Sequence, residues 1–104
     1  MVDERRIITD ASLARKVRII GMNETTVSND MLQVQVEVLN TTRRVQRFNY
    51  AFEWYTLDGM LITTPPTTWK SRQIEGGESI FLTAVAPSPN AKDFRLKLLE
   101  SVRR

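Results

Sequence analysis

The feature that most constrains the fold of this chain is a row of aromatic residues at alternate positions: Phe48, Tyr50, Phe52 and Trp54. Successive side chains of a β-strand point to opposite faces, so these four rings share one face of one strand. The Asp58-Gly59 pair follows and predicts a tight turn, because glycine tolerates positive φ. We therefore expect the aromatic strand to form one wall of a hydrophobic core, with Trp54 buried in it.

A second alternating run, from Leu32 to Leu39, supplies the opposite wall. Leu32, Val34, Val36 and Val38 fall on one face of a strand, and polar residues fall on the other. A valine row of this kind needs a large apolar partner, and the aromatic row provides it. A row of exposed aromatic rings can also serve as a stacking platform for bases or sugars, which is the functional alternative for the same residues.

Further strands are indicated before and after these two rows. A strand over 16–22 would place Val17 and Ile19 on one face and Ile20 and Met22 on the other, with turns at 23–26 and 28–30. A polar loop is expected at 40–44. Later segments with strand character, separated by turns or prolines, are 60–63, 67–74, 79–86 and 94–98.

The pattern as a whole predicts an all-β fold, an immunoglobulin-like antiparallel β-sandwich of about seven strands. A small barrel is the alternative. The 104 residues suit one domain. We assign 16–104 to that domain and 1–15 to a partly ordered N-terminal segment, which offers a short strand at 7–9 and a capped helical turn at 10–14.

The amino-acid composition excludes most kinds of catalytic site. The chain has neither cysteine nor histidine, so it lacks thiol nucleophiles, thiolate metal ligands and the usual general base. Ser71, Ser79 and Ser88 have no histidine to activate them. The acidic candidates Glu37, Glu53 and Asp58 fall on outer or turn positions, and Gly76-Gly77 predicts a hairpin turn. We expect a protein that is not an enzyme and that binds no metal or cofactor.

The net charge of +3 is small, and the basic residues form short groups. These groups could attract an anionic surface such as phospholipid headgroups, or they could protect strand edges from aggregation. Charges this dispersed do not predict specific nucleic-acid binding. The groups are Arg5-Arg6, Arg15-Lys16-Arg18, Arg43-Arg44-Arg47 and Arg103-Arg104.

The outer side of the aromatic strand is the candidate interface. Arg47, Tyr55 and Leu57 fall on that side, with Ala51 between them leaving room for another surface, and Trp69 lies on the segment that follows. Exposed tyrosine and arginine are common at protein interfaces. We predict contact with another protein or a second copy here. The competing interpretation is that Tyr55 and Leu57 pack under the Trp69 segment.

Taken together, these motifs resemble the YcfL-like family of uncharacterised bacterial lipoproteins. The resemblance spans residues 16 to 101 and rests on Leu-x-Val-x-Val-x-Val-Leu-Asn at 32–40, Phe-x-Tyr-x-Phe-x-Trp-Tyr at 48–55, Asp58-Gly59, Trp69, Ala86-Pro87 and Phe94-Arg95-Leu96.

The resemblance implies an exported protein with a lipidated cysteine after its signal peptide, anchored at the outer membrane and facing the periplasm. Membrane attachment would depend only on that N-terminal lipid, which this chain lacks. No catalytic or binding residue is carried over. The expected role is non-catalytic protein binding or scaffolding in the periplasm. The alternative is a cytosolic or nucleic-acid-associated binding module that uses the arginine groups.

Overall fold

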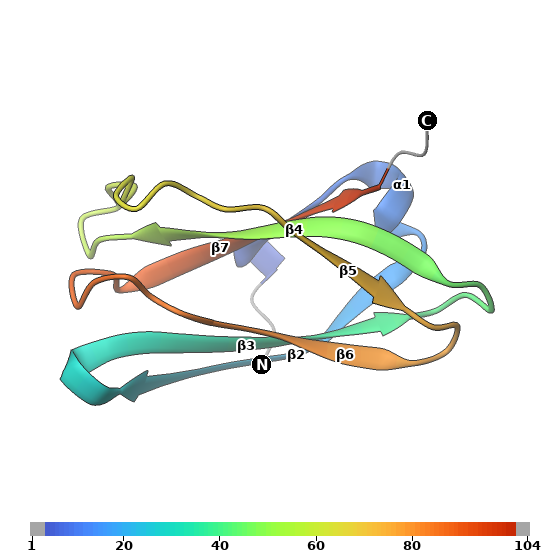
Figure 1. Cartoon of the computed structure of the whole chain (residues 1–104), viewed down its shortest axis with the longest axis horizontal. Coiled ribbons are helices and arrows are strands. Elements are labelled where there is room, and N and C mark those ends of the chain that lie inside the picture. The colour runs from blue at the N-terminus through green and yellow to red at the C-terminus, as the bar shows by residue number, and fades with distance from the viewer. Residues whose placement is uncertain (1–3, 102–104) are drawn as a thin grey trace.

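The computed structural model describes residues 4–101, which form two packed β-sheets (Figure 1). One sheet has the strand order β1-β7-β4-β5 and the other β2-β3-β6. All pairings are antiparallel except that of β1 with β7. The strands are β1 (Ile7–Thr9), β2 (Val17–Val27), β3 (Met31–Asn40), β4 (Gln46–Tyr55), β5 (Lys70–Ile74), β6 (Ser79–Val85) and β7 (Asp93–Glu100), with short helical turns η1 (Glu4–Arg6), α1 (Ala11–Ala14) and η2 (Ser28–Asp30). The predicted immunoglobulin-like sandwich of seven strands is confirmed.

The core lies between the valine face of β3 and the aromatic face of β4, as the alternation predicts. Val34, Val36, Val38 and Phe48 are fully buried, and Trp54 is 9% exposed. Burial of one such side chain contributes about 1.5–3 kcal/mol, so these two rows supply much of the stabilisation of a small domain. The aromatic row is thus a structural wall rather than an exposed stacking platform.

Strand β2 is longer than predicted. Residues 23–26 are not a turn but pair with β3, from Asn23 with Gln35 to Thr26 with Leu32. The reversal occurs only at η2, where Asn29 and Asp30 adopt positive φ, a conformation that Asn and Asp tolerate better than most residues. A register shift between Ile19 and Gly21 also reverses the expected facing of Met22, which is buried with the core.

The chain after β4 makes a turn at Asp58-Gly59, and Gly59 has a φ of 84°. The expected strand at 60–63 is reduced to one bridge between Leu61 and Tyr55. Strand β5 begins at Lys70, later than the predicted start at 67. Pro65 and Pro66 lack the N–H that a strand ladder requires, which accounts for the interruption.

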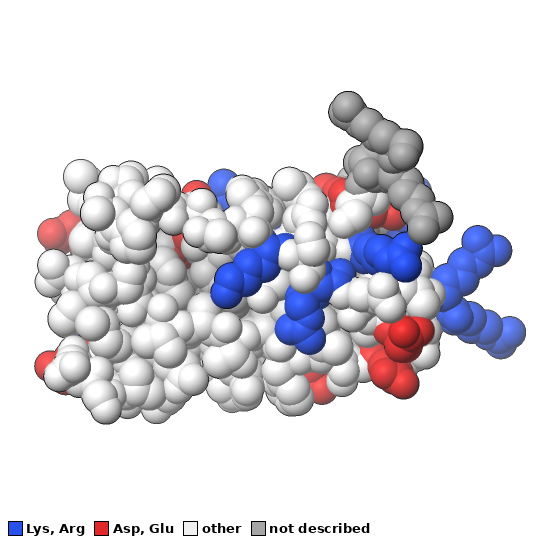
Figure 2. Space-filling model, in the orientation of Figure 1, with Lys and Arg blue, Asp and Glu red and all other residues white. Residues whose placement is uncertain are grey.

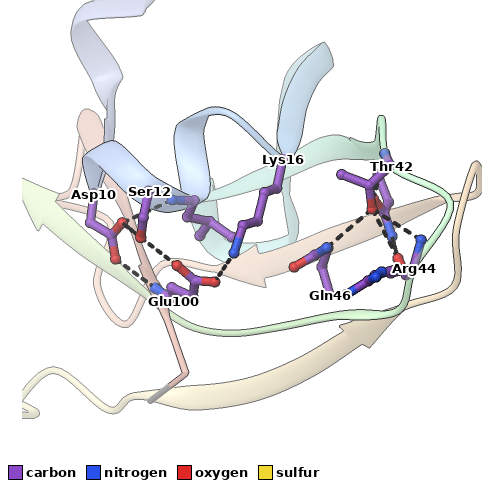
Figure 3. A network of polar contacts seen from close by, with 9 residues as sticks. Asp10, Ser12, Lys16, Thr42, Arg44, Gln46 and Glu100 are labelled. Carbon is purple, nitrogen blue, oxygen red and sulfur yellow. Dashed lines mark hydrogen bonds and ion pairs between the residues drawn. The ribbon is translucent and has the colours of Figure 1, made fainter. Parts of the chain in front are cut away.

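The N-terminal segment is part of the sandwich. Strand β1 adds an edge to the first sheet beside β7, and Leu13 of α1 is fully buried. Asp10 caps α1 by accepting from the Leu13 N–H at 2.9 Å, and it also accepts from the Glu100 N–H at 2.8 Å. Ser12 and Lys16 both donate to the Glu100 carboxylate, so a polar network joins α1 to the end of β7 (Figure 3).

A second polar network centres on Asn40, which the sequence places in a loop. In the structure it ends β3 and is fully buried. Its amide donates to the carbonyls of Arg44 at 2.6 Å and Ile74 at 3.0 Å, and its Oδ1 accepts from the Thr42 N–H at 2.9 Å. Asn40 therefore ties the β3–β4 loop, seen beside the first network in Figure 3, to the end of β5.

Gly76, in the turn after β5, lies against the same loop. A Cβ atom at this position would come within 2.4 Å of the Arg43 carbonyl carbon and oxygen. We expect Gly76→Ala to lower the free energy of unfolding by about 1–3 kcal/mol, since backbone must move to relieve the overlap. Urea titration measures this.

The matched control for that substitution is Gly21→Ala, where the added Cβ meets Glu37 atoms at an ordinary 3.5 Å. Equal stability of the two variants would show that the β5–β6 turn is free to move away from Arg43.

The α1–β7 network makes the stability of the fold depend on pH. The backbone N–H groups of Leu13 and Glu100 lower the pKa of Asp10, and the hydrogen bonds from Lys16 and Ser12 lower the pKa of Glu100. A carboxyl group with a lowered folded-state pKa stabilises the fold above its unfolded-state pKa, and this stabilisation is lost as the pH falls through the folded-state pKa.

We therefore expect the stability advantage of the wild type over an Asp10→Asn, Glu100→Gln variant to be constant near neutral pH and to shrink below about pH 4. Urea unfolding at a series of pH values measures the difference. An advantage that persists unchanged to about pH 2 would contradict this assignment.

Candidate functional site

The edge of β4 on the β5 side is interrupted. Strand β5 pairs with β4 only as far as the Lys70–Tyr50 pair. The other arm of the β4 hairpin rejoins at Ile62, whose N–H donates to the Trp54 carbonyl at 2.8 Å. The chain between Ile62 and Lys70 leaves the sheet and contains Pro65 and Pro66. Phe52 therefore lies where β4 has no strand neighbour on this side.

A cleft of about 200 Å³ opens at this interruption, between β4, the 62–70 segment and β6. Ala84 and Val85 of β6 form its far wall. Because β6 is the edge strand of the second sheet, the cleft runs between the free edges of both sheets. The aromatic and proline side chains that line it are Tyr50, Phe52, Trp54, Pro65, Pro66 and Pro87.

The polar side chains that line the cleft carry hydroxyls or an ammonium: Tyr50, Thr67, Thr68, Thr83 and Lys70. The Tyr50 hydroxyl has no hydrogen-bond partner among residues 4–101, and the Lys70 ammonium makes no ion pair within the same range. Figure 2 shows this face of the molecule: Lys and Arg side chains lie over β5, while the half beside the loop after β4 is largely uncharged. The cleft thus offers apolar contact, several hydroxyls and one ammonium. This combination suits recognition of an apolar group with a negative charge nearby.

The chain matches the family model described as protein of unknown function (DUF1425) over residues 4–100. It belongs to the DUF1425 family. Two solved structures share its fold. The crystal structure of Campylobacter jejuni cj0090 has a TM-score of 0.81 and 21% identity, covering 92% of this chain and 98% of that one. A DUF1425 family member from Shewanella sp. pv-4 has a TM-score of 0.74 and 22% identity, covering 85% and 81%. None of the curated proteins matches the chain.

The four predicted interface residues do not form one cluster in this DUF1425 domain. Arg47 begins the outer face of β4, and its Nε donates to Gln73 Oε1 at 3.0 Å. Tyr55 lies at the opposite end of the same strand, roughly 27 Å away along an extended chain. Leu57 is in the turn and 86% exposed, and Trp69, just before β5, is 45% exposed.

The outer face also lacks the expected room at Ala51, which is only 1% exposed. On the same face of β4, Tyr55 is half-buried and its hydroxyl donates to Glu53 Oε1 at 3.2 Å. The Arg95 guanidinium lies 5.1 Å from the centre of the Tyr55 ring. Burial and the Glu53 carboxylate raise the pKa of the Tyr55 phenol. Tyr55 is therefore held in place by its own sheet, whereas Leu57 is not.

Arg6 and Arg47 are among the arginines that make contacts within the fold. Arg6 pairs with Glu24 at 2.6 Å and with Asp93 at 2.9 Å, and Arg47 is bonded to Gln73 as described above. Arg43 and Arg44 are exposed in the β3–β4 loop. The Arg103-Arg104 group lies outside the described residues.

The structure contains no preformed metal centre or membrane helix within the part it describes. Across residues 4–101, no three acidic side chains gather as metal ligands would. In the same part of the chain, no helix has the length and apolar character that crossing a bilayer requires.

Sequence reasoning placed Tyr50, Phe52 and Trp54 in the core and so missed the cleft. The available signal was Pro65-Pro66. Two adjacent prolines after an aromatic strand indicate that the next strand cannot cover its full length. Lys70 was missed because the strand was expected to begin at residue 67, whereas β5 begins at Lys70, beside the cleft.

The contrast between Tyr55 and Leu57 gives a direct test of the outer face. We expect Leu57→Ser to change the free energy of unfolding by less than about 0.5 kcal/mol, and Tyr55→Ala to lower it by about 1–3 kcal/mol. Urea unfolding measures both.

If Leu57→Ser proves as damaging as Tyr55→Ala, Leu57 packs against the domain in solution. Loss of self-association in sedimentation velocity on Leu57→Ser alone would support the predicted interface at this turn.

Proposed function

We propose that this DUF1425 domain is the non-catalytic, protein-binding part of a bacterial envelope lipoprotein, held at the outer membrane and facing the periplasm. The cleft between the free edges of the two sheets carries the binding proposal. Aromatic side chains are enriched at protein interfaces, and concave apolar surfaces with a few polar groups are the usual form of a binding site.

The polar groups at the cleft favour binding over bond cleavage. General acid–base catalysis needs a proton donor and acceptor positioned at the reacting group. Here Lys70 and Tyr50 face an apolar recess, and neither is bonded to a described acidic side chain that could act with it. The cleft can therefore bind a ligand through apolar contact, shape and the positive charge of Lys70, which is what a binding module requires.

The resemblance to YcfL-like lipoproteins supports the location. Its two longest motifs, at 32–40 and 48–55, are the facing walls of the core in β3 and β4. They are therefore signatures of this sandwich. The lipid anchor and the periplasmic location are inferred from that resemblance. We expect the full-length protein to incorporate labelled palmitate and to fractionate with outer membranes. Recovery of the protein only in the cytosol would refute the location.

Site-specific photo-crosslinking in living cells tests the binding role. A benzoylphenylalanine residue at Pro66, which is exposed and lines the cleft, should form an adduct with another protein. The same residue at exposed Asn90, which does not line the cleft, should not. The Ala84→Met substitution, which fills the cleft from β6, should remove the Pro66 adduct.

The matched control is the same alanine-to-methionine change at exposed Ala11 in α1, which should leave the adduct intact. An adduct that forms equally with Ala84→Met, or no protein adduct at all from Pro66, would refute the cleft as the binding site.

A further inference from the structure

The backbone of Phe52 points into the interruption of the β4 edge. The Trp54 carbonyl accepts from Ile62 on the β5 side, whereas the Tyr55 carbonyl accepts from Lys92 on the β7 side. Backbone groups of successive strand residues point to alternate sides, and the β4 register is unbroken. The N–H and C=O of Phe52 therefore point to the β5 side, where no residue of the described range forms a hydrogen bond with them.

The open stretch has the length of a short strand. It runs along β4 from Tyr50, the last residue paired with β5, to Trp54, which is bonded to Ile62. Four residues of extended chain span about 13 Å. Ala51, Phe52, Pro65 and Thr68 line the same cleft, so the space lies between the β4 edge and the detour of the chain. An extended segment of about four residues fits this length.

The charges around the cleft have one sign. Lys70 is the one ionisable residue with a charge at neutral pH among those that line it. Arg72, two residues further along β5, is also exposed and makes no ion pair with any residue from 4 to 101. A carboxylate on the bound segment would be attracted to this side of the cleft.

We propose that an extended polypeptide segment carrying an acidic residue completes the β4 edge at Phe52. Its backbone bonds to the Phe52 N–H and C=O, one of its apolar side chains enters the cleft between Trp54 and Ala84, and its carboxylate lies near Lys70. This is strand addition, in which main-chain hydrogen bonds give affinity and alternate side chains give specificity. The inference rests on the proposed protein-binding function and specifies its ligand and docking mode.

A library of random linear peptides displayed on phage is the probe. The wild-type domain is the target, and the cleft-filled Ala84→Met domain is the counter-target. Thr68→Trp, on the exposed loop that lines the cleft, is the second blocked variant should Ala84→Met fail to fold. The selected peptides should alternate apolar with other residues and contain Asp or Glu.

The backbone contact has its own readout. In the complex with a selected peptide, hydrogen exchange of the Phe52 amide measured by NMR should slow by at least about tenfold. Methylating the one peptide nitrogen that faces Phe52 should weaken binding by about tenfold, whereas methylating the next nitrogen, which points away, should not. Lys70→Gln should weaken binding of acidic peptides about two- to fivefold, and Lys92→Gln, outside the cleft, should have no effect.

The outcomes separate the two proposals. Peptides that bind the cleft with unchanged Phe52 exchange, and that tolerate methylation at every nitrogen, would overturn strand addition while leaving protein binding at the cleft intact. Selection of no peptide over the blocked variant would overturn both. If no peptide is selected and dodecanoate slows amide hydrogen exchange at the cleft, the cleft binds an acyl chain. That result would also overturn both strand addition and protein binding at the cleft.

Discussion

The structure depends first on the packing of the β4 aromatic row against the β3 valine row. Each row occupies every second position, so a slip of one residue in either strand would turn its whole apolar face to solvent. This fixes the register of the central strands, and with it the neighbours that β4 and β3 can accept. Phe48 and Val36, both fully buried, lie in the part of the core where this constraint is complete.

The same aromatic row changes its role along β4. At Phe48 the strand is paired on both sides, and the ring is fully buried. Beyond Tyr50 the β5 neighbour is missing because Pro65 and Pro66 cannot continue a ladder. Phe52 and Trp54 then become the wall of a cleft while still contacting the core, with their ring centres 5.9 Å apart. A cleft thus arises beside core residues where the strand that would cover them is missing.

Alternation in the sequence predicts β3, β4, β6 and the buried face of each, because period-two burial is a local property. It fails for β2 beyond Met22, where exposed polar residues resemble a turn although they pair with β3. It also fails at Asn40, since the carbonyls that bind this side chain come from Arg44 and Ile74. Alternation does not predict the cleft for a similar reason. Whether an aromatic ring is covered depends on which strand crosses it, and in this sequence the signal for a missing cover is Pro65-Pro66 rather than the alternation itself.

An unpaired strand edge is a hazard, because another copy of the same edge can pair with it. Here the open stretch at Phe52 is short, prolines lie on its outer side, and Lys70 and Arg72 on β5 would repel the same residues of a second copy. These features disfavour self-pairing but do not disfavour an acidic segment, which would gain from the same charges. The polar networks of Asn40 and Glu100 hold the C-terminal ends of β3 and β7, and neither residue lines the cleft. A segment can therefore enter the edge without breaking the contacts that hold the sandwich together.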